Sequence, residues 1–402
     1  MSHHPDTSLI SAPIPGVPGA LLTLASSHTE AAENDGAGIV SEIHEYQVPL
    51  FAVQALDRLY GSLYGSYRHL QLCEDVHVPP HTWVGYRCGE IVGVLLFRVE
   101  TSRVLVLTEM FMLDETIATC FCHSVFDRYP SSRAIVFNAI SMNMARSALP
   151  FQQYVFSENY VLDLPDSVEA YFERLGKSTR KTLKGYGKRL LRDHPDLEWR
   201  SFSADELPRH QQRALIRQLQ EFKQSSMAAR GKKALTDVRD TARMLVMVAE
   251  SGLFGMATVH GKLCAGSVAC RVGHNYVMLL SASDPALSAY RLGLLSCYWA
   301  ICDCIRSGAR QCHLLWGRYQ YKEQLLAQPQ WLHKMRIYRS RWQMLTSPVE
   351  VLGMRWQGVL HRLRRWLLND LPSRSDLCST LLARALMLAR SVLAARRVNI
   401  KN

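Results

Sequence analysis

Side chains that could perform chemistry gather in one stretch, Tyr276 to Leu325. Asp284 follows an apolar run, His313 lies in a second apolar run, and Tyr321 and Lys322 come shortly after it. An aspartate or a histidine can take a proton from an attacking nucleophile, and a hydroxyl or an ammonium can donate to a developing negative charge. If a thioester can also be anchored nearby, these residue types favour acyl transfer to an amine or a hydroxyl.

Each candidate also has a purely structural interpretation. Asp284 can form the Asx turn that commonly precedes a proline such as Pro285. His313 can be a satisfied core histidine, because it is flanked by apolar residues. Tyr321 and Lys322 can form an exposed loop end. Both interpretations stay open at the level of sequence.

The elements around these residues predict an anchor for an anion. Val277–Leu280 is a short apolar run that predicts a buried strand, and Pro285 ends it. Gly293 to Arg306 predicts a helix, and Cys312–Trp316 predicts a second strand. Strand, loop, helix and strand make a βαβ unit, in which free backbone amides at the helix start favour a negatively charged ligand.

The residues of this stretch resemble a known family. Over Tyr171–Leu325 the sequence is similar to the C-terminal catalytic region of the CelD/BcsL family of GNAT-type acyltransferases, which are distant relatives of the FemAB-like aminoacyl transferases. The matching segments are Ser283-Asp284-Pro285, Ala289-Tyr290-Arg291-Leu292-Gly293-Leu294-Leu295, the ending Gly317-x-x-x-Tyr321-Lys322, and an opening with Tyr171-x-x-x-Leu175 and the basic run from Ser178 to Lys184.

The resemblance implies a CoA-dependent N- or O-acyltransferase that acts near cell-surface polysaccharide or envelope biosynthesis. Acyl-CoA, in the first place acetyl-CoA, would be the co-substrate, no metal would be needed, and the acceptor would be a small molecule or a glycan. The residues that would contact the co-substrate are Arg180, Tyr290, Arg291, Gly293 and Leu294, and the catalytic candidates are Asp284, His313, Tyr321 and Lys322.

Two other functions remain open. A FemAB-like transfer of an aminoacyl group from charged tRNA would use the basic run as an RNA contact. A catalytically degenerate scaffold of a polysaccharide synthase is the other alternative, because Tyr290 and Leu295 stand at the flanking positions of the phosphate loop around Gly293 and match neither of them.

Length and composition indicate an ordinary soluble protein. The chain has 402 residues, which suffices for two domains, and no apolar run reaches the length that spans a bilayer. No basic residue precedes the short apolar run Leu21–Ala25, which argues against a secretory signal. The 11 cysteines include no Cys-x-x-Cys and lie mostly in apolar segments, as expected of reduced thiols. We therefore expect a cytoplasmic protein.

The order of predicted elements indicates an α/β protein of tandem GNAT-like domains, with mixed sheets flanked by helices and a C-terminal helical tail. Strands followed by a helix and a returning strand recur in both halves. The expected division is a disordered tail over 1–42, an N-terminal GNAT-like domain over 43–166, a C-terminal GNAT acyltransferase domain over 167–346, and a basic amphipathic helical tail over 347–402.

Residues 168–192 predict one strongly basic helix with an apolar stripe along it. Its cations can be a solvated face, or some of them, Arg180 among them, can meet the phosphates of an acyl-CoA. The basic run does not favour nucleic-acid binding, because no aromatic platform or recognition motif accompanies the charge.

The tail combines positive charge with an apolar stripe. Residues 350–402 hold nine arginines and one lysine against three acidic residues, a net charge of 10 − 3 = +7 within a total of +12. The apolar residues Leu352, Trp356, Val359, Leu360, Leu363, Trp366 and Leu367 follow helical spacing, and Leu377–Arg397 predicts a further helix. Such a stripe suits the surface of an anionic membrane at the inner face, or it packs on the second domain.

Overall fold

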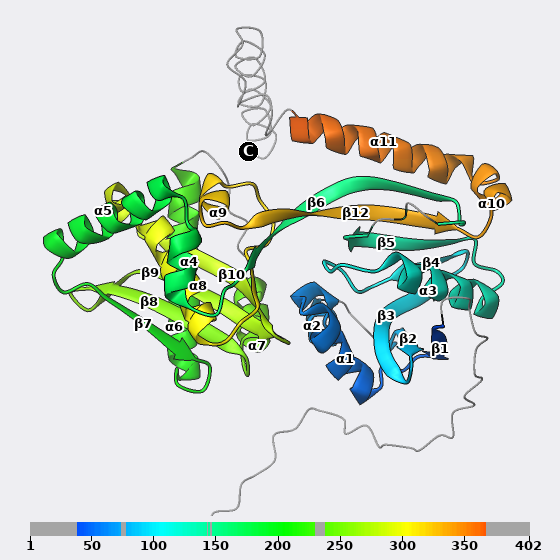
Figure 1. The fold of residues 1–402 in the computed structure, drawn as a ribbon, viewed down its shortest axis with the longest axis horizontal. Coiled ribbons are helices and arrows are strands. Elements are labelled where there is room, and N and C mark those ends of the chain that lie inside the picture. The colour runs from blue at the N-terminus through cyan, green and yellow to red at the C-terminus, as the bar shows by residue number, and fades with distance from the viewer. Residues whose placement is uncertain (1–37, 74–77, 143, 145–146, 230–237, 367–402) are drawn as a thin grey trace, which may run out of the picture.

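One twelve-stranded sheet runs through the described part of the chain. A computed structural model describes residues 38–73, 78–142, 144, 147–229 and 238–366. The strands follow the order β1-β2-β3-β4-β5-β12-β6-β11-β10-β9-β8-β7. Figure 1 shows the two ends of this sheet as separate lobes, joined by the long strands β6 and β12.

The bounds of the elements are as follows. The strands are β1 Val40–His44, β2 His81–Arg87, β3 Glu90–Glu100, β4 Arg103–Val106, β5 Ala134–Ile140, β6 Phe151–Asp163, β7 Glu198–Ser203, β8 Gly252–Val259, β9 Lys262–Val272, β10 Asn275–Ser283, β11 Gln311–His313 and β12 Gln328–Tyr338. The α-helices are α1 Leu50–Tyr60, α2 Tyr67–Cys73, α3 Glu115–Arg128, α4 Val168–Arg174, α5 Lys177–Asp193, α6 Arg209–Ala228, α7 Val238–Met247, α8 Leu292–Arg306, α9 Gln320–Gln324, α10 Arg341–Leu345 and α11 Pro348–Arg365. Two 3₁₀ helices are η1 Leu63–Gly65 and η2 Pro285–Tyr290.

The two halves repeat one order of elements. The first half runs β1, α1, α2, β2, β3, β4, α3, β5, and the second runs β7, α6, α7, β8, β9, β10, α8, β11. In each half the first four strands form antiparallel pairs, and a helix then leads to a parallel strand: β4 pairs with β5, and β10 with β11. The βαβ unit that the sequence predicts is thus confirmed, and a second copy of it lies in the first half.

The last strand of each half lies in the sheet of the other. β6, which follows β5 in the chain, pairs with β11, and β12, which follows β11, pairs with β5. The two exchanged strands pair with each other along almost their whole length, from Gln328 opposite Val161 to Ile337 opposite Phe151. The expected division between 43–166 and 167–346 is therefore crossed by β12, which belongs to the second half in sequence and to the first half in pairing.

Helices cover both faces of the sheet in each half. In the second half, α8 packs on one face with α4 and α5, through a core that includes Tyr171, Leu183 and Leu190. On the opposite face, α6 packs through a second core that includes Leu219 and receives Leu63 from the first half. Buried leucines contribute about 1.5–3 kcal/mol each, so these two cores hold the helices that frame the strand ends of β10 and β11.

The halves also meet at a tight glycine contact. Gly273, at φ +57 in the turn between β9 and β10, faces helix α1, and a Cβ there would lie 2.3 Å from the carbonyl oxygen of Asp57. The side-chain amide of Asn275 donates to the carbonyl of Gly61 over 3.3 Å. Only glycine permits this approach at a left-handed φ, so α1 lies directly against the start of β10.

Three expectations need correction. The helix predicted over 168–192 is two helices, α4 and α5, because Leu175 and Gly176 adopt extended backbone conformations between them. The strand predicted over Cys312–Trp316 ends at His313, because Leu315 takes a positive φ of 56°. β1 begins at Val40, inside the segment 1–42 that we expected to be disordered. Residues 1–37 and the helix expected over Leu377–Arg397 lie outside the described residues.

Candidate functional site

The strands β10 and β11 part soon after they pair. Their parallel pairing covers three residue pairs and ends with Val277 opposite His313. β11 then turns toward β6, where the Leu314 amide donates to the Tyr160 carbonyl over 2.7 Å. Within the described part of the chain, β10 continues to Ser283 in pairing with β9 alone, so one edge of it is open.

A β-bulge lies on the same stretch of β10. The register to β9 shifts between Met278 and Leu280, so that Leu279 has no direct partner on β9. Bulges redirect backbone groups and are common beside active sites. An extended ligand could therefore form backbone hydrogen bonds with β10 where β11 has turned away.

The corresponding place in the first half is closed. Beyond the paired part of β4 and β5, the Met110 amide donates to the Ala139 carbonyl over 2.6 Å, and the Ser141 amide donates to the Phe111 carbonyl over 3.0 Å. A further parallel bridge joins Met112 to Ser141. In the first half, backbone hydrogen bonds thus continue beyond β4 and β5. In the second half, β10 and β11 have separated at the equivalent position.

Helix α8 starts with an open N-terminus beside this edge. Its N-cap Arg291 has a left-handed φ of 49°, makes no side-chain capping bond, and no acidic residue lies in the first turn. Gly293 is exposed and presents no side chain, and a Cβ there would lie 3.3 Å from the Ser283 hydroxyl oxygen. The first amides of α8 and its dipole therefore favour an anion, such as the phosphates of an acyl-CoA.

Helix α3, the counterpart of α8, carries a carboxylate at its start. The Asp114 side chain accepts from the amide of Thr116 over 2.8 Å, and Glu115 occupies the first turn. An anion would meet two negative charges there, which destabilise it. Of the two repeated helices, only α8 has a start without a capping carboxylate.

Helix α5 is tied to the start of α8 by aromatic and charged contacts. The Arg291 guanidinium lies 5.7 Å from the ring centre of Tyr186, and the Arg189 guanidinium lies 5.1 Å from that of Tyr290. The Tyr290 hydroxyl donates to Asp193 over 3.1 Å. Helix α5 thus brings its positive charge beside Tyr290, Arg291 and Gly293, whose role as co-substrate contacts stays a prediction.

Leu294 and Arg180 are the other two residues predicted to contact the co-substrate, and their surroundings differ from those of Tyr290, Arg291 and Gly293. Leu294 is buried in the core against α5, and its amide donates within the helix to Arg291 over 2.9 Å. Arg180 is half-buried on α5, nine residues before Arg189, and its role as a phosphate contact stays a prediction.

His313 is the centre of a buried polar network on the opposite face of the sheet. The Gln311 amide donates to Asp163 over 2.8 Å, so its oxygen, 3.3 Å from Nε2 of His313, is the acceptor there. His313 therefore donates through Nε2, and its Nδ1 accepts from the Asn159 amide over 3.1 Å. Asn275 also reaches the Gln311 oxygen, at 3.4 Å.

This environment keeps the imidazole neutral. Burial lowers the pKa of His313 to about 4, and the nearby Asp163 opposes the shift only weakly. A second ring proton would also point at the amide hydrogens of Asn159. As a neutral side chain whose two ring nitrogens are both bound to the protein, His313 is better suited to hold the polar network in place than to store a proton at neutral pH.

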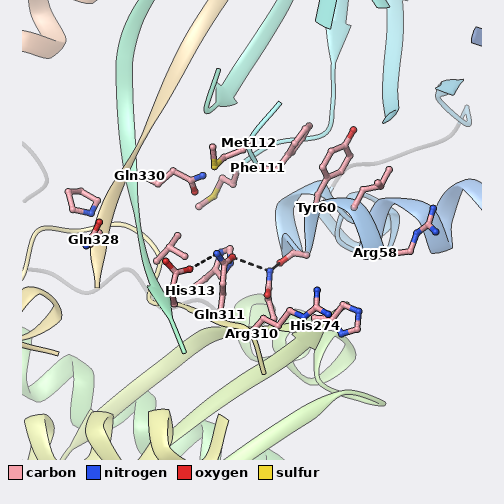
Figure 2. A pocket seen from close by; sticks show the side chains of 17 residues that line it. Arg58, Tyr60, Phe111, Met112, His274, Arg310, Gln311, His313, Gln328 and Gln330 are labelled. Atoms are coloured by element: carbon pink, nitrogen blue, oxygen red, sulfur yellow. Dashed lines mark hydrogen bonds between the residues drawn. The ribbon is translucent and has the colours of Figure 1, made fainter. Parts of the chain in front are cut away.

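The network forms one wall of a cavity between the halves. Its volume is about 580 Å³. Figure 2 shows Tyr60 and Phe111 of the first half on one side, and Gln311 and His313 on the other. The polar lining combines cationic, amide and imidazole side chains with one carboxylate: Arg58, Arg310, Asn275, Gln311, Gln328, Gln330, His274, His313 and Asp163. Such a cavity can hold a hydroxyl-rich or amino-bearing small molecule next to the point where β10 and β11 part.

Lys322 is buried rather than exposed at a loop end. It is 2% exposed, and its ammonium donates to the carbonyls of Leu315 and Trp316 over 3.0 and 2.8 Å. Burial lowers its pKa to about 8. The side chain also lies 5.0 Å from the ring centre of Tyr160. Lys322 thus holds the chain that turns away from β10.

Tyr321 lies beside Lys322 and faces the core under α8. Its ring lies 6.0 Å from that of Tyr319, and burial raises the pKa of its hydroxyl. Both Tyr321 and Lys322 lie within electrostatic range of Cys297, in the second turn of α8. The motif ending therefore lies near the open start of α8.

Asp284 is separated from His313. It follows the far end of β10, seven residues beyond the Val277 that pairs with His313, or roughly 20 Å along a strand. Its side chain accepts from the Ala286 amide over 2.9 Å and caps η2. The structural interpretation of Asp284 as a turn residue agrees with this geometry.

Several residues of the site escaped the sequence analysis. Asn159, Asp163 and Gln311 lie on β6 and β11 and meet only through strand exchange. Tyr186 and Asp193 look like ordinary surface positions of a basic helix. In the described ranges, no group of three or more His, Cys, Asp or Glu side chains could hold a metal ion.

Comparisons with known proteins bear on this site. Residues 177–323 match the family model of the acetyltransferase (GNAT) domain. No curated protein matches the sequence. The chain is similar to the crystal structure of FemX, with a TM-score of 0.52 and 10% identity over 73% of this chain and 96% of that chain.

Weaker similarities, with TM-scores below 0.5, extend to two further structures. One is the C-terminal domain of a putative lysylphosphatidylglycerol synthetase from Agrobacterium fabrum, with a TM-score of 0.39 and 11% identity over 63% of this chain and 83% of that chain. The other is a conserved protein of unknown function from Bacteroides thetaiotaomicron VPI-5482, with a TM-score of 0.44 and 10% identity over 72% and 96%.

The likeness to FemX concerns the fold alone, since the identity is low. Together with the family match and the repeated order of elements, it confirms the α/β fold of tandem GNAT-like halves. Membership of the CelD/BcsL family stays a prediction. The second half of the chain carries a GNAT acetyltransferase domain, and the protein is an acyltransferase.

Proposed function

We propose that this protein transfers an acyl group from acyl-CoA, in the first place acetyl-CoA, to an amine or hydroxyl of a small-molecule or glycan acceptor. The observation that carries the proposal is the contrast between the halves. The second half combines an open edge of β10 with an uncapped start of α8, whereas α3 in the first half is capped by Asp114. A degenerate scaffold would not need this difference.

The donor would lie along β10, with its phosphates at the start of α8. Gly293 allows close approach to the amides, and Arg291 and the cations of α5, Arg180 among them, supply positive charge. The thioester would reach the point where β10 and β11 separate, between Leu279 and His313.

The acceptor would occupy the cavity between the halves. Its nucleophile attacks the thioester carbonyl, a tetrahedral intermediate forms, and the C–S bond breaks with CoA thiolate as the leaving group. The proton of the nucleophile finally neutralises this thiolate. The polar network held by His313 would orient the nucleophile, and the Tyr321 hydroxyl would donate toward the sulfur. Asp284 would act indirectly, by shaping the turn before α8.

The cellular setting follows from the resemblance of Tyr171–Leu325 to the CelD/BcsL family. It supports a role in cell-surface polysaccharide or envelope biosynthesis, on the cytoplasmic side and peripheral to the inner face of the membrane. The cavity supports this setting only through the chemistry of its lining, because its amide and cationic side chains can form hydrogen bonds with hydroxyl-rich acceptors.

The test is release of free CoA thiol from acetyl-CoA in the presence of amino sugars, sugar nucleotides and simple amines, with products identified by mass spectrometry. We expect acceptor-dependent thiol release, with the acyl group on one nitrogen or oxygen of the acceptor. Transfer from aminoacyl-tRNA but from no acyl-CoA would instead support the FemAB-like alternative. Failure with both donor classes would contradict an acyltransferase with this range of acceptors.

A further inference from the structure

Helix α11 lies along β6 and uses one face for this contact. Gly358 is buried against Tyr154, and a Cβ there would lie 3.1 Å from the Cβ of Tyr154. The Gln152 side chain donates to the Val351 carbonyl over 3.3 Å, and the His361 ring lies 5.4 Å from the ring of Tyr154. Figure 1 shows the helix running alongside β6 and β12. The inward face of α11 is therefore fixed.

The apolar stripe of the helix faces the other way. Eight large apolar side chains of α10 and α11 are exposed by 44–82%: Trp342, Leu345, Val349, Leu352, Trp356, Val359, Leu360 and Leu363. We call this set the α10–α11 apolar surface. The expectation that the stripe packs on the second domain is not met within the described residues, because none of these side chains is buried there.

A rim of positive charge surrounds this surface. Arg341, Arg355, Arg362 and Arg365 are exposed, and none of them has a carboxylate partner within the described residues. The one acidic residue of α10 and α11, Glu350, is paired with Arg336 of β12. Arg365 lies over the exposed ring of Trp331, 4.9 Å from its centre. Tryptophans bordered by unpaired guanidiniums are typical of helices that lie in a membrane interface.

We propose that the α10–α11 apolar surface binds the surface of an anionic lipid bilayer, with α11 lying in the plane of the interface. The proposed function places the protein at the periphery of the membrane, and this inference rests on that location. It specifies which surface of the protein binds and which class of lipid it binds. None of the described helices is long and apolar enough to cross a bilayer, so binding would be interfacial.

Charge decides between the candidate occupants. The residues beyond α11, 367–402, carry six basic and two acidic side chains, so they repel the arginine rim rather than complement it. A second copy of the chain would bring an identical basic rim. Anionic lipid headgroups instead add attraction to the burial of the apolar stripe, and each basic residue near such a surface strengthens binding about fivefold.

The test is flotation of the full-length protein with vesicles of phosphatidylcholine alone or mixed with phosphatidylglycerol, at low and high salt. We expect binding to the anionic vesicles, a decrease of at least tenfold at high salt, and little binding to neutral vesicles. Trp356→Gln/Leu360→Gln should reduce binding at least tenfold, and Leu191→Gln/Val246→Gln, which changes two exposed apolar residues elsewhere, should not.

A second double variant, with its own control, tests the arginines that surround the α10–α11 apolar surface. Arg355→Gln/Arg362→Gln should weaken binding by about 25-fold, and Arg87→Gln/Arg217→Gln, which removes two exposed arginines elsewhere, should leave it nearly unchanged. If each control variant lost as much vesicle binding as the α10–α11 variant it is matched with, the assignment of binding to this surface would be overturned.

Two further outcomes would overturn the proposal. If the stripe is covered by the protein's own chain or by a second copy, Trp356→Gln/Leu360→Gln will lower Tm by several degrees or change the sedimentation coefficient, and the wild type will ignore vesicles. If the stripe faces solvent, Trp356→Gln/Leu360→Gln should change Tm by less than about 2 °C. Stabilisation by acetyl-CoA should be the same in all variants, so failure here leaves the proposed acyl transfer untouched.

Discussion

The Nδ2 atom of Asn159 lies 3.1 Å from Nδ1 of His313, and this contact joins strands from different halves of the chain. Both side chains are buried, and the neighbouring Gln311 and Asp163 continue the chain of hydrogen bonds. Because each polar group in such a network must match its neighbour, the network fixes the register of β11 against β6. It also fixes the tautomer of the buried imidazole that lines the cavity.

The first prediction concerns pH. The folded-state pKa of His313 is lowered to about 4 from 6.5, so between these values the unfolded chain binds more protons than the folded one. Stability should therefore be complete above pH 6.5 and decrease as pH falls toward 4. This side chain should account for a loss of about 2 kcal/mol between pH 7.5 and pH 5.

Urea unfolding of wild type and His313→Gln at the two pH values measures this difference. The variant should lose about 2 kcal/mol less than wild type on acidification, and His274→Gln, at an exposed histidine of the same cavity, should behave like wild type. Equal losses for wild type and His313→Gln would contradict a buried, neutral His313.

The second prediction compares two turn glycines. Gly261 and Gly273 both have a positive φ, in consecutive hairpin turns, but a Cβ at Gly261 would meet open space and one at Gly273 would meet the Asp57 carbonyl of α1. Gly261→Ala should cost about 1 kcal/mol from backbone strain alone. Gly273→Ala should cost at least about 3 kcal/mol, because α1 must also move.

Chemical unfolding of both variants gives the comparison. Similar losses would mean that the first half does not press on the β9–β10 turn, and that the cavity between the halves is not rigidly framed.

The third prediction concerns Lys322, whose ammonium satisfies two backbone carbonyls in a buried place. Lys322→Met should lower the free energy of unfolding by about 2 kcal/mol or more, since Leu315 and Trp316 lose their donor. Lys262→Met, at an exposed lysine, should change it by less than about 0.5 kcal/mol. If Lys322→Met unfolds like wild type but loses activity, the lysine acts in turnover rather than in holding the chain.

The fourth prediction separates Tyr321 from its neighbour. Tyr321→Phe keeps the ring that packs under α8 and removes only the hydroxyl. Thermal stability should stay within about 0.5 kcal/mol of wild type, whereas kcat should fall at least tenfold, about 1.4 kcal/mol of transition-state stabilisation. Unchanged kcat would remove the hydroxyl from the reaction.

The sequence predicts the local part of the site well. Apolar runs bounded by turn residues define β10 and α8, and the missing side chain of Gly293 marks the helix start. Whether Asp284 and Lys322 are exposed or bound to backbone depends on neighbours that no spacing rule specifies. Asp284 caps a turn, and Lys322 is buried under Tyr160.

Long-range pairing is the part that the sequence does not predict. The exchange of β6 and β12 brings Asn159 beside His313, although 154 positions separate them. Either strand could pair within its own half by the same alternation of side chains, because register reflects the burial of a whole face. The network and the cavity follow from this exchange, so neither could be inferred before the topology was known.

The central claim is that one acyl-CoA binds per chain, at the open start of α8 and not at α3. Isothermal titration with acetyl-CoA measures it most directly. We expect a stoichiometry of one, loss of binding in Gly293→Val, where a branched side chain covers the first amides of α8, and unchanged binding in Gly185→Val on α5, where a Cβ meets open space. Absence of binding in the wild type, two sites per chain, or full binding by Gly293→Val would contradict the account.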